Sequence, residues 1–181
     1  MDTTFLPGYE VPKPPSQYMK FEQGANKFRI LMSPIVGYSA WTKDDKHIRT
    51  KTEKEIPLDK IKEDRKVKHF WAMPVWNYNE KRVQILELEQ VGIQKKIKGL
   101  ANNDDWGSPL GYDITVTREG EKLKTDYEVQ PSPKSDPSLE ISEAWAEVKN
   151  KGFDITKLYT GENPFGDGSI VQVADDTPTD E

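Results

Sequence analysis

Short segments of alternating apolar and polar residues run through the first two thirds of the chain, and they predict strands. In residues 26–34, NKFRILMSP, Lys27 and Arg29 fall on one face while Phe28 and Ile30 fall on the other. Side chains of a strand point alternately to its two faces, so this segment predicts a strand with one cationic and one buried face.

The same alternation predicts further strands. They lie in residues 46–51, 68–78 and 81–90, and in the two arms of a hairpin at 112–129. In the shortest of them, KHIRTK, we expect Ile48 to point inward and Arg49 outward.

Two segments have helical spacing instead. Residues 90–102 put Val91, Ile97 and Leu100 on an apolar face and gather lysines in the last turns, where they suit the negative end of a helix. Residues 139–152 put Leu139, Trp145 and Ala146 at roughly helical spacing, with Ser138 as the N-cap.

Five to six short strands with one helix between consecutive strands, and no βαβ alternation, predict a mainly β protein. We expect a small Greek-key barrel of the OB type. Residues 1–20 would form an extended proline-rich arm and residues 21–131 the OB-fold domain. Residues 132–165 would hold a linker and a C-terminal helix, and residues 166–181 a flexible acidic tail.

Composition narrows the class of protein. Of the 181 residues, 34% are hydrophobic and 31% are charged, and there is no cysteine. A disulfide framework and a thiolate metal site are therefore excluded. We find neither an apolar run of about 18 residues nor the pattern of a signal peptide, so we expect no membrane contact and a cytoplasmic location.

The net charge of -5 conceals an asymmetry. Residues 1–130 contain 22 Lys and Arg against 20 Asp and Glu, whereas residues 131–181 contain 4 against 11. Residues 27–68 alone contain 12 basic and 7 acidic residues. A basic region followed by an acidic end is compatible with a polyanionic partner, although the whole-chain charge argues against one.

Motifs for enzymatic chemistry are missing from the sequence. It has no GxxxxGK[ST], GxGxxG, HExxH or GxSxG. The two histidines, His47 and His69, have no cysteine to complete a zinc site. Acidic residues at 44–45 and 103–105 leave a magnesium-dependent nuclease open as an alternative. We predict no catalytic residue, no metal and no cofactor.

The sequence does offer aromatic residues interleaved with cations, chiefly in residues 68–78, KHFWAMPVWNY, and 37–43, GYSAWTK. Proteins that bind single-stranded nucleic acid use this mixture, because cations follow the phosphates while rings stack on exposed bases. The candidate DNA-binding residues are Arg29, Tyr38, Trp41, Lys43, Arg49, Lys51, Lys68, Trp76, Tyr78, Lys81, Arg118 and Lys124.

Pro74 decides which face each ring of residues 68–78 occupies. If it does not shift the register, one face carries Phe70, Ala72, Trp76 and Tyr78, and the other carries Trp71, Met73 and Val75. We assign Phe70, Trp71 and Met73 to the core, and Lys68, Trp76 and Tyr78 to contact with DNA.

Longer phrases of the chain resemble a known family. They are NKFRILMSPIVGYSAW, KHFWAMPVWNYNEKRVQILELEQ, GYDITVTREGEKLKTDYEVQPSP, and NPF before an acidic end. Over about residues 5–165 the sequence resembles the single-stranded-DNA-binding proteins of tailed bacteriophages. The resemblance implies an OB-fold protein without catalytic activity that coats single-stranded DNA in phage replication, repair and recombination, in the cytoplasm of the infected bacterium.

The resemblance also implies a role for the acidic end, here Asp175, Asp176, Asp180 and Glu181. In the family this end recruits replication proteins such as polymerase and helicase-primase, or folds back on the DNA site. An OB-like module for protein interaction remains the alternative from a different class. Monomer and homodimer both remain open.

Overall fold

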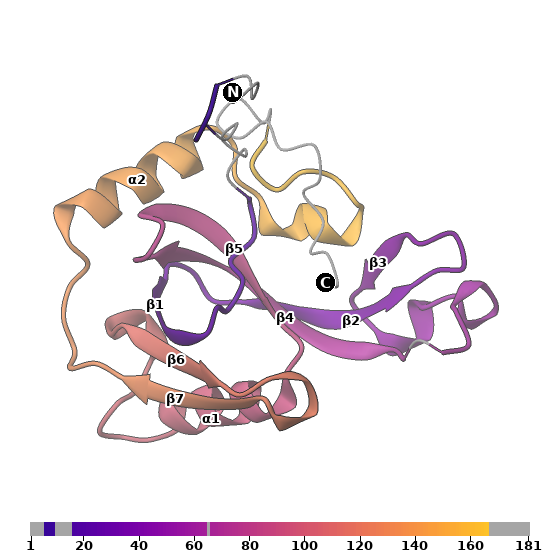
Figure 1. Ribbon diagram of the computed structural model, residues 1–181, viewed down its shortest axis with the longest axis horizontal. Coiled ribbons are helices and arrows are strands. Elements are labelled where there is room, and N and C mark those ends of the chain that lie inside the picture. The colour runs from indigo at the N-terminus through magenta and orange to yellow at the C-terminus, as the bar shows by residue number, and fades with distance from the viewer. Residues whose placement is uncertain (1–5, 10–15, 65, 167–181) are drawn as a thin grey trace.

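The computed structural model describes residues 6–9, 16–64 and 66–166. Within them, seven strands form one antiparallel sheet with two α-helices beside it (Figure 1), which confirms a mainly β protein. The strands are β1 (Gly24–Ile30), β2 (Ile35–Trp41), β3 (His47–Thr50), β4 (Lys68–Asn77), β5 (Arg82–Leu88), β6 (Ile114–Glu119) and β7 (Asp126–Pro131). The helices are α1 (Val91–Ala101) and α2 (Leu139–Asn150). Short 3-10 turns are η1 (Glu53–Glu55), η2 (Leu58–Lys60), η3 (Pro109–Gly111), η4 (Lys122–Lys124) and η5 (Ile155–Tyr159).

Strand β4 lies at the centre of the sheet, whose order is β3-β2-β4-β1-β6-β7 with β5 paired to β4. One edge of β4 pairs with β2 over residues 68–72 and with β1 over residues 75–77. The other edge pairs with β5 over residues 71–77 without interruption at Pro74. The register therefore passes the proline without a bulge, as the alternation required.

The expected barrel is wrong, because the sheet is not closed. The outer edge of β5 is occupied by the chain before β1, where the Met19 amide donates to the Ile85 carbonyl at 2.8 Å and the Ile85 amide donates to Gln17 at 2.7 Å. In the part of the chain that the structure describes, β7 pairs only with β6. Closing the sheet into a barrel would require a free edge on β5, but residues 17–19 already form hydrogen bonds with that edge.

Both faces of the sheet are covered. On one face α1 contributes Ile93 and Ile97 to a core with Phe28 and Met73. On the other face, α2 and η5 contribute Ile141 and Leu158 to a core with residues such as Phe70, Trp76 and Ile85. Trp76, which we expected to contact DNA, is therefore buried.

The helices form where expected, but the apolar face of α2 differs from the predicted one. Ser138 caps α2 by accepting the Ile141 amide at 3.3 Å, as predicted. Ile141 and Val148 are the buried residues of α2, whereas Leu139 is 72% exposed. In α1, Ile97 is buried and Leu100 packs against the first core as expected, whereas Val91 is exposed. The exposed residues Val91 and Leu139 are each the first residue of their helix.

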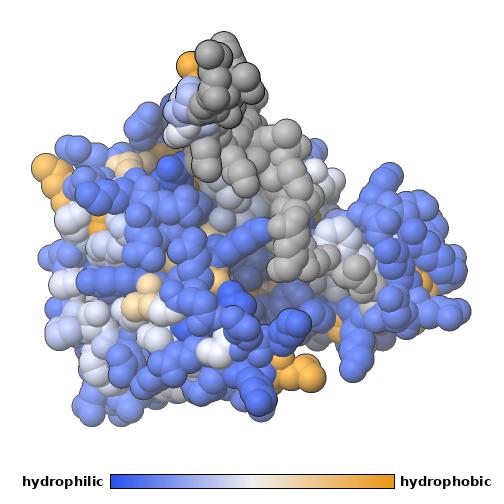
Figure 2. Space-filling view, in the orientation of Figure 1, coloured by the Kyte–Doolittle hydropathy of each residue, from blue (hydrophilic) through white to orange (hydrophobic). Residues whose placement is uncertain are grey.

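Strands β2 and β3 and the first half of β4 extend away from the rest of the molecule (Figure 1), and we call them the arm. Hydrophilic residues cover most of the surface in this view (Figure 2). A small core of Ala40, Ile56 and Ile61 stabilises the arm, so the highly charged segment 53–66, which reads as a surface loop in the sequence, contributes two buried residues. Gly37 allows the strands to lie close, since a Cβ there would meet the Thr50 carbonyl oxygen at 2.2 Å.

Candidate nucleic-acid interface

One face of the arm carries rings and cations in neighbouring positions. In the antiparallel register, Trp41 lies opposite His47, and Ser39 lies opposite both Arg49 and Lys68. Residues directly opposite each other point to the same face, as do residues two apart. We call this side of the arm the cationic face; it carries Trp41, His47, Lys51, Lys68 and Tyr159 at its surface, with Arg49 buried beneath them.

Aromatic residues lie at the two ends of the cationic face. Trp41 and His47 stack with their ring centroids 4.7 Å apart and their planes 11° from parallel. At the other end, η5 brings Tyr159 over the sheet, where its hydroxyl donates to the Val36 carbonyl at 2.6 Å. The Lys51 ammonium lies 5.5 Å from the centroid of the Tyr159 ring. Between the two ends, β2 contributes only the small residues Gly37 and Ser39 to this face.

The positively charged side chains of this face differ in their burial and in their ion-pair partners. Arg49 is buried, and it donates to both carboxylate oxygens of Glu87 at 2.5 and 3.0 Å. The alternation of β3 is as expected, since Ile48 packs against the small core around Ala40, but the prediction that Arg49 faces solvent is wrong. The arginine joins β3 to β5 and is not at the surface. Lys68 is 60% exposed and lies 3.6 Å from Glu89, so it remains accessible to an anion.

Burial and charge shift the pKa values at this site. Burial alone would lower the pKa of Arg49, but the hydrogen bonds and the charge of Glu87 outweigh it and the pKa is raised. Burial, followed by repulsion from Glu87, raises the pKa of Glu89, although Lys68 opposes that shift. Glu89 is therefore a carboxylate whose ionisation costs the folded state free energy.

The structure brings four of the predicted DNA-binding residues together on this face, namely Trp41, Arg49, Lys51 and Lys68. Lys43 is exposed just beyond Trp41. Tyr38 lies on the same strands but faces the other way, 5.3 Å from the ring of His69.

The remaining predicted residues lie elsewhere. Trp76 is 4% exposed and belongs to the second core. Lys81 is exposed in the turn after β4, about 30 Å along that strand from Lys68. Arg118 is half-buried and donates to the Phe21 carbonyl, and Lys124 is exposed in the β6–β7 connection. The tail residues 175, 176, 180 and 181 lie outside the described residues.

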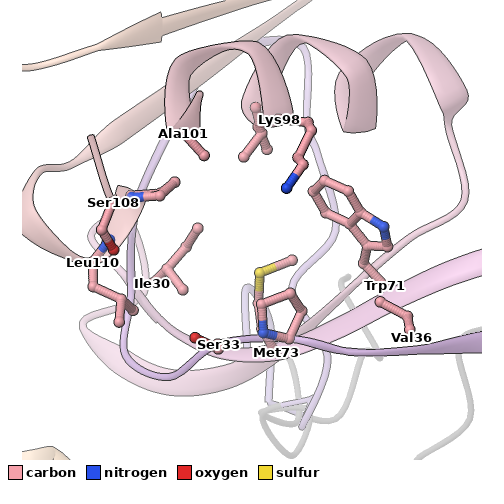
Figure 3. Close-up of a pocket in the computed structure, with 12 residues that line it drawn as sticks. Ile30, Ser33, Val36, Trp71, Met73, Lys98, Ala101, Ser108 and Leu110 are labelled. Carbon is pink, nitrogen blue, oxygen red and sulfur yellow. The ribbon is translucent and has the colours of Figure 1, made fainter. Parts of the chain in front are cut away.

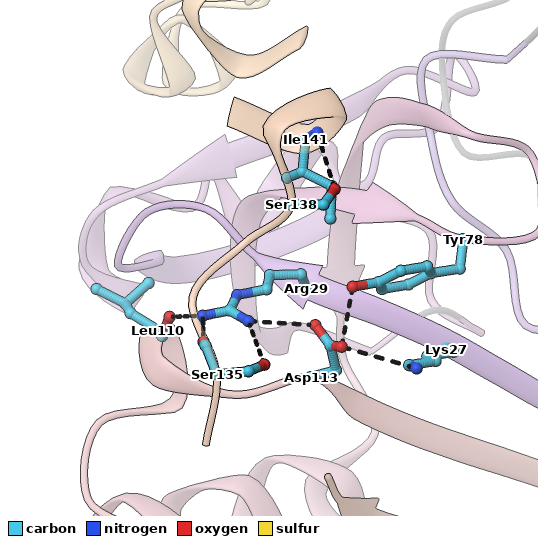
Figure 4. Close-up of polar contacts among 8 residues, drawn as sticks. All are labelled: Lys27, Arg29, Tyr78, Leu110, Asp113, Ser135, Ser138 and Ile141. Atoms are coloured by element: carbon cyan, nitrogen blue, oxygen red, sulfur yellow. Dashed lines mark hydrogen bonds and ion pairs between the residues drawn. The ribbon is translucent and has the colours of Figure 1, made fainter. Parts of the chain in front are cut away.

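Arg29 and Tyr78 belong to a buried network (Figure 4). Arg29 is 3% exposed; its guanidinium donates to the carbonyls of Leu110 at 2.9 Å and Ser135 at 2.6 Å, and lies 3.5 Å from the Asp113 carboxylate. The Tyr78 hydroxyl donates to Asp113 at 2.9 Å, and burial together with this bond raises its pKa to about 12. The network fastens the segment before α2 to β1.

The opposite face of the arm carries a pocket of about 440 Å³ (Figure 3). Trp71 and Met73 form its floor and one side, α1 contributes Lys98 and Ala101, and residues 108–110 close the far side. Trp71 is only half-buried. Sequence reasoning assigned Trp71 to the core and Trp76 to the surface; Trp71 does pack against the first core while it also lines the pocket, whereas Trp76 is buried. No feature of the sequence alone indicates that α2 and η5 cover one face of β4 while the other opens beside α1.

Among the described residues, no group of three or more acidic residues or histidines is arranged to hold a metal ion. No helix in the described part of the chain has the length and apolarity to cross a membrane. Comparisons with protein-family models, with curated proteins and with solved structures returned no match.

Replacing Arg29 by Met should lower the free energy of unfolding by about 3 to 5 kcal/mol, because Asp113 is left buried without its main cationic partner. Urea denaturation followed by circular dichroism measures this change. Lys27→Met is the matched control, because Lys27 also lies near Asp113, at 3.7 Å, but its side chain is 45% exposed. Equal effects of the two substitutions would contradict the role given to the network.

Glu89→Gln should stabilise the protein more at pH 8 than at pH 4. The folded-state pKa of Glu89 is raised, so the cost of its charge is absent below the usual pKa and grows as the pH rises through the raised value. Urea denaturation at several pH values measures the difference, with the exposed Glu119→Gln as control. A stabilisation that does not change with pH would refute this account of Glu89.

Proposed function

We propose that the protein binds single-stranded DNA through the cationic face, without catalysis and largely independently of sequence. The observation that carries the proposal is the placement of Trp41 and His47, Lys51 and Lys68, and Tyr159 on one side of three adjacent strands and η5. Stacking on rings tolerates any base, and lysines neutralise phosphates without reading sequence.

The mechanism follows from the chemistry of these groups. Bases stack on the rings at the ends of the face, while Lys68, opposite Ser39, and Lys51, beside Tyr159, neutralise the phosphates. Glu89 competes with the phosphate for Lys68, since it lies 3.6 Å from the ammonium. The ion pair of Arg49 and Glu87 holds β3 in place, so the arginine acts as a positioning residue.

We further infer connectivity of the OB type. The order of a β4–β5 hairpin, helix α1 and a β6–β7 hairpin supports it, with β1 between β4 and β6. The protein would then be an open relative of the barrel, with α1 against one side of the sheet.

The resemblance to phage single-stranded-DNA-binding proteins supports a role in coating DNA during replication, repair and recombination in an infected bacterium. It also supports polymerase and helicase-primase as partners of the acidic end. Both are proposals that rest on the sequence phrases.

Lys68→Gln should weaken binding to a 25-nucleotide oligo(dT) about fivefold at 0.1 M salt and reduce the slope of log K against log[salt] by about 0.7, the value for one phosphate contact on a single strand. Titration of tryptophan fluorescence at several salt concentrations measures both quantities.

Lys81→Gln is the matched control, because it removes the same charge from the far end of β4. We expect it to leave the affinity and the slope unchanged. Oligo(dT) that neither quenches the fluorescence nor binds with salt dependence would refute the proposal and favour the protein-interaction module. Shortening of the oligonucleotide in the presence of magnesium would favour the nuclease.

A further inference from the structure

The pocket on the opposite face of the arm combines features that suit a flat, polar ring. Its walls are largely apolar, from Ile30, Met73, Ile97 and Pro109, and the half-buried Trp71 supplies an aromatic surface. Its volume of about 440 Å³ is in the range of sites for small ligands, which are typically apolar with a few placed polar groups.

The polar side chains of the pocket favour one kind of ligand. They are the Lys98 ammonium and the hydroxyls of Ser33 and Ser108 (Figure 3), and no lining residue is acidic. The Ser108 oxygen already accepts the Leu110 amide at 3.3 Å, so its hydrogen remains available to donate. A lysine donates only, and this set therefore matches a ligand rich in acceptors and carrying negative charge.

We propose that this pocket binds one nucleotide, with a base that bears carbonyl oxygens, such as thymine, against Trp71 and its phosphate on Lys98. Thymine offers two carbonyl acceptors to the lysine and serine donors, and its methyl group suits the apolar wall. Adenine instead presents an amino group, and the lining side chains include no carboxylate to accept its hydrogens. The ligand can be a free nucleotide or one unstacked residue of a strand held on the cationic face. Binding of an unstacked strand residue rests on the proposed function, whereas binding of a free nucleotide does not.

The test uses thymidine monophosphate, thymidine, adenosine monophosphate and ribose 5-phosphate as probes with the full-length protein, and follows the indole signal of Trp71 by NMR. Ala101→Leu fills the pocket from α1 and should weaken thymidine monophosphate about tenfold or more, the usual effect of losing one stacked base. Ala146→Leu makes the same change at an exposed position of α2 and should have no effect.

Lys98→Gln should weaken thymidine monophosphate severalfold but leave thymidine unchanged, while Lys95→Gln, on the same helix and outside the pocket, should change neither. If Ala101→Leu does not fold, Ser33→Val at the exposed rim replaces it. Three results would each overturn the proposal. One is unchanged binding of thymidine monophosphate to the Ala101→Leu variant, and another is binding of ribose 5-phosphate as tight as that of thymidine monophosphate. The third is a Trp71 signal that shifts with protein concentration alone. The last result would place a second copy of the chain in the pocket.

Two further results separate this proposal from the proposed function. Binding of thymidine monophosphate at Trp71 without any binding of oligo(dT) would support the pocket and refute the single-strand proposal. Binding of oligo(dT) that the Ala101→Leu and Lys98→Gln variants leave unchanged, with no mononucleotide at Trp71, would overturn the pocket alone.

Discussion

The register of β4 is the constraint on which the rest of the molecule depends. One edge of this strand pairs first with β2 and then with β1, and Pro74 lies where the partner changes. The Pro74 carbonyl accepts the Leu31 amide at 3.0 Å. The N–H and C=O of a strand residue point to the same edge, so the N–H that proline lacks would have faced the junction between β1 and β2. The strand therefore tolerates the proline, and its side chains keep one alternation throughout.

That alternation gives the arm two chemically different faces. Phe70 and Lys68 point to the side on which η5 lies, and Trp71 and His69 point to the side of the pocket. Because β2 and β3 are paired in register with β4, their side chains follow the same division. A slip of one residue would exchange the two faces, so the same backbone pairing that builds the sheet also separates the cations from the pocket.

Much of the fold could be predicted from the sequence, because strands and helices leave periodic patterns. The register through Pro74 and the Ser138 cap are local features, and the structure has both. The features that could not be predicted depend on which distant segments of the chain pack over a given residue. Arg29 alternates like a surface residue, yet the segment before α2 folds over it; Trp76 is covered by a helix more than sixty residues later. For the candidate site, Trp41, Lys51 and Lys68 could be found from local charge and rings, whereas Trp71 could not.

The central claim is that single-stranded DNA lies on the cationic face, and an NMR titration of ¹⁵N-labelled protein with oligo(dT) tests it most directly. The account predicts that the Trp41 indole signal and the amides of Ser39, Arg49 and Lys68 shift together as DNA is added, while the Trp145 indole on α2 does not move. Shifts confined to the β6–β7 hairpin around Arg118 and Lys124, with Trp41 unchanged, would contradict it.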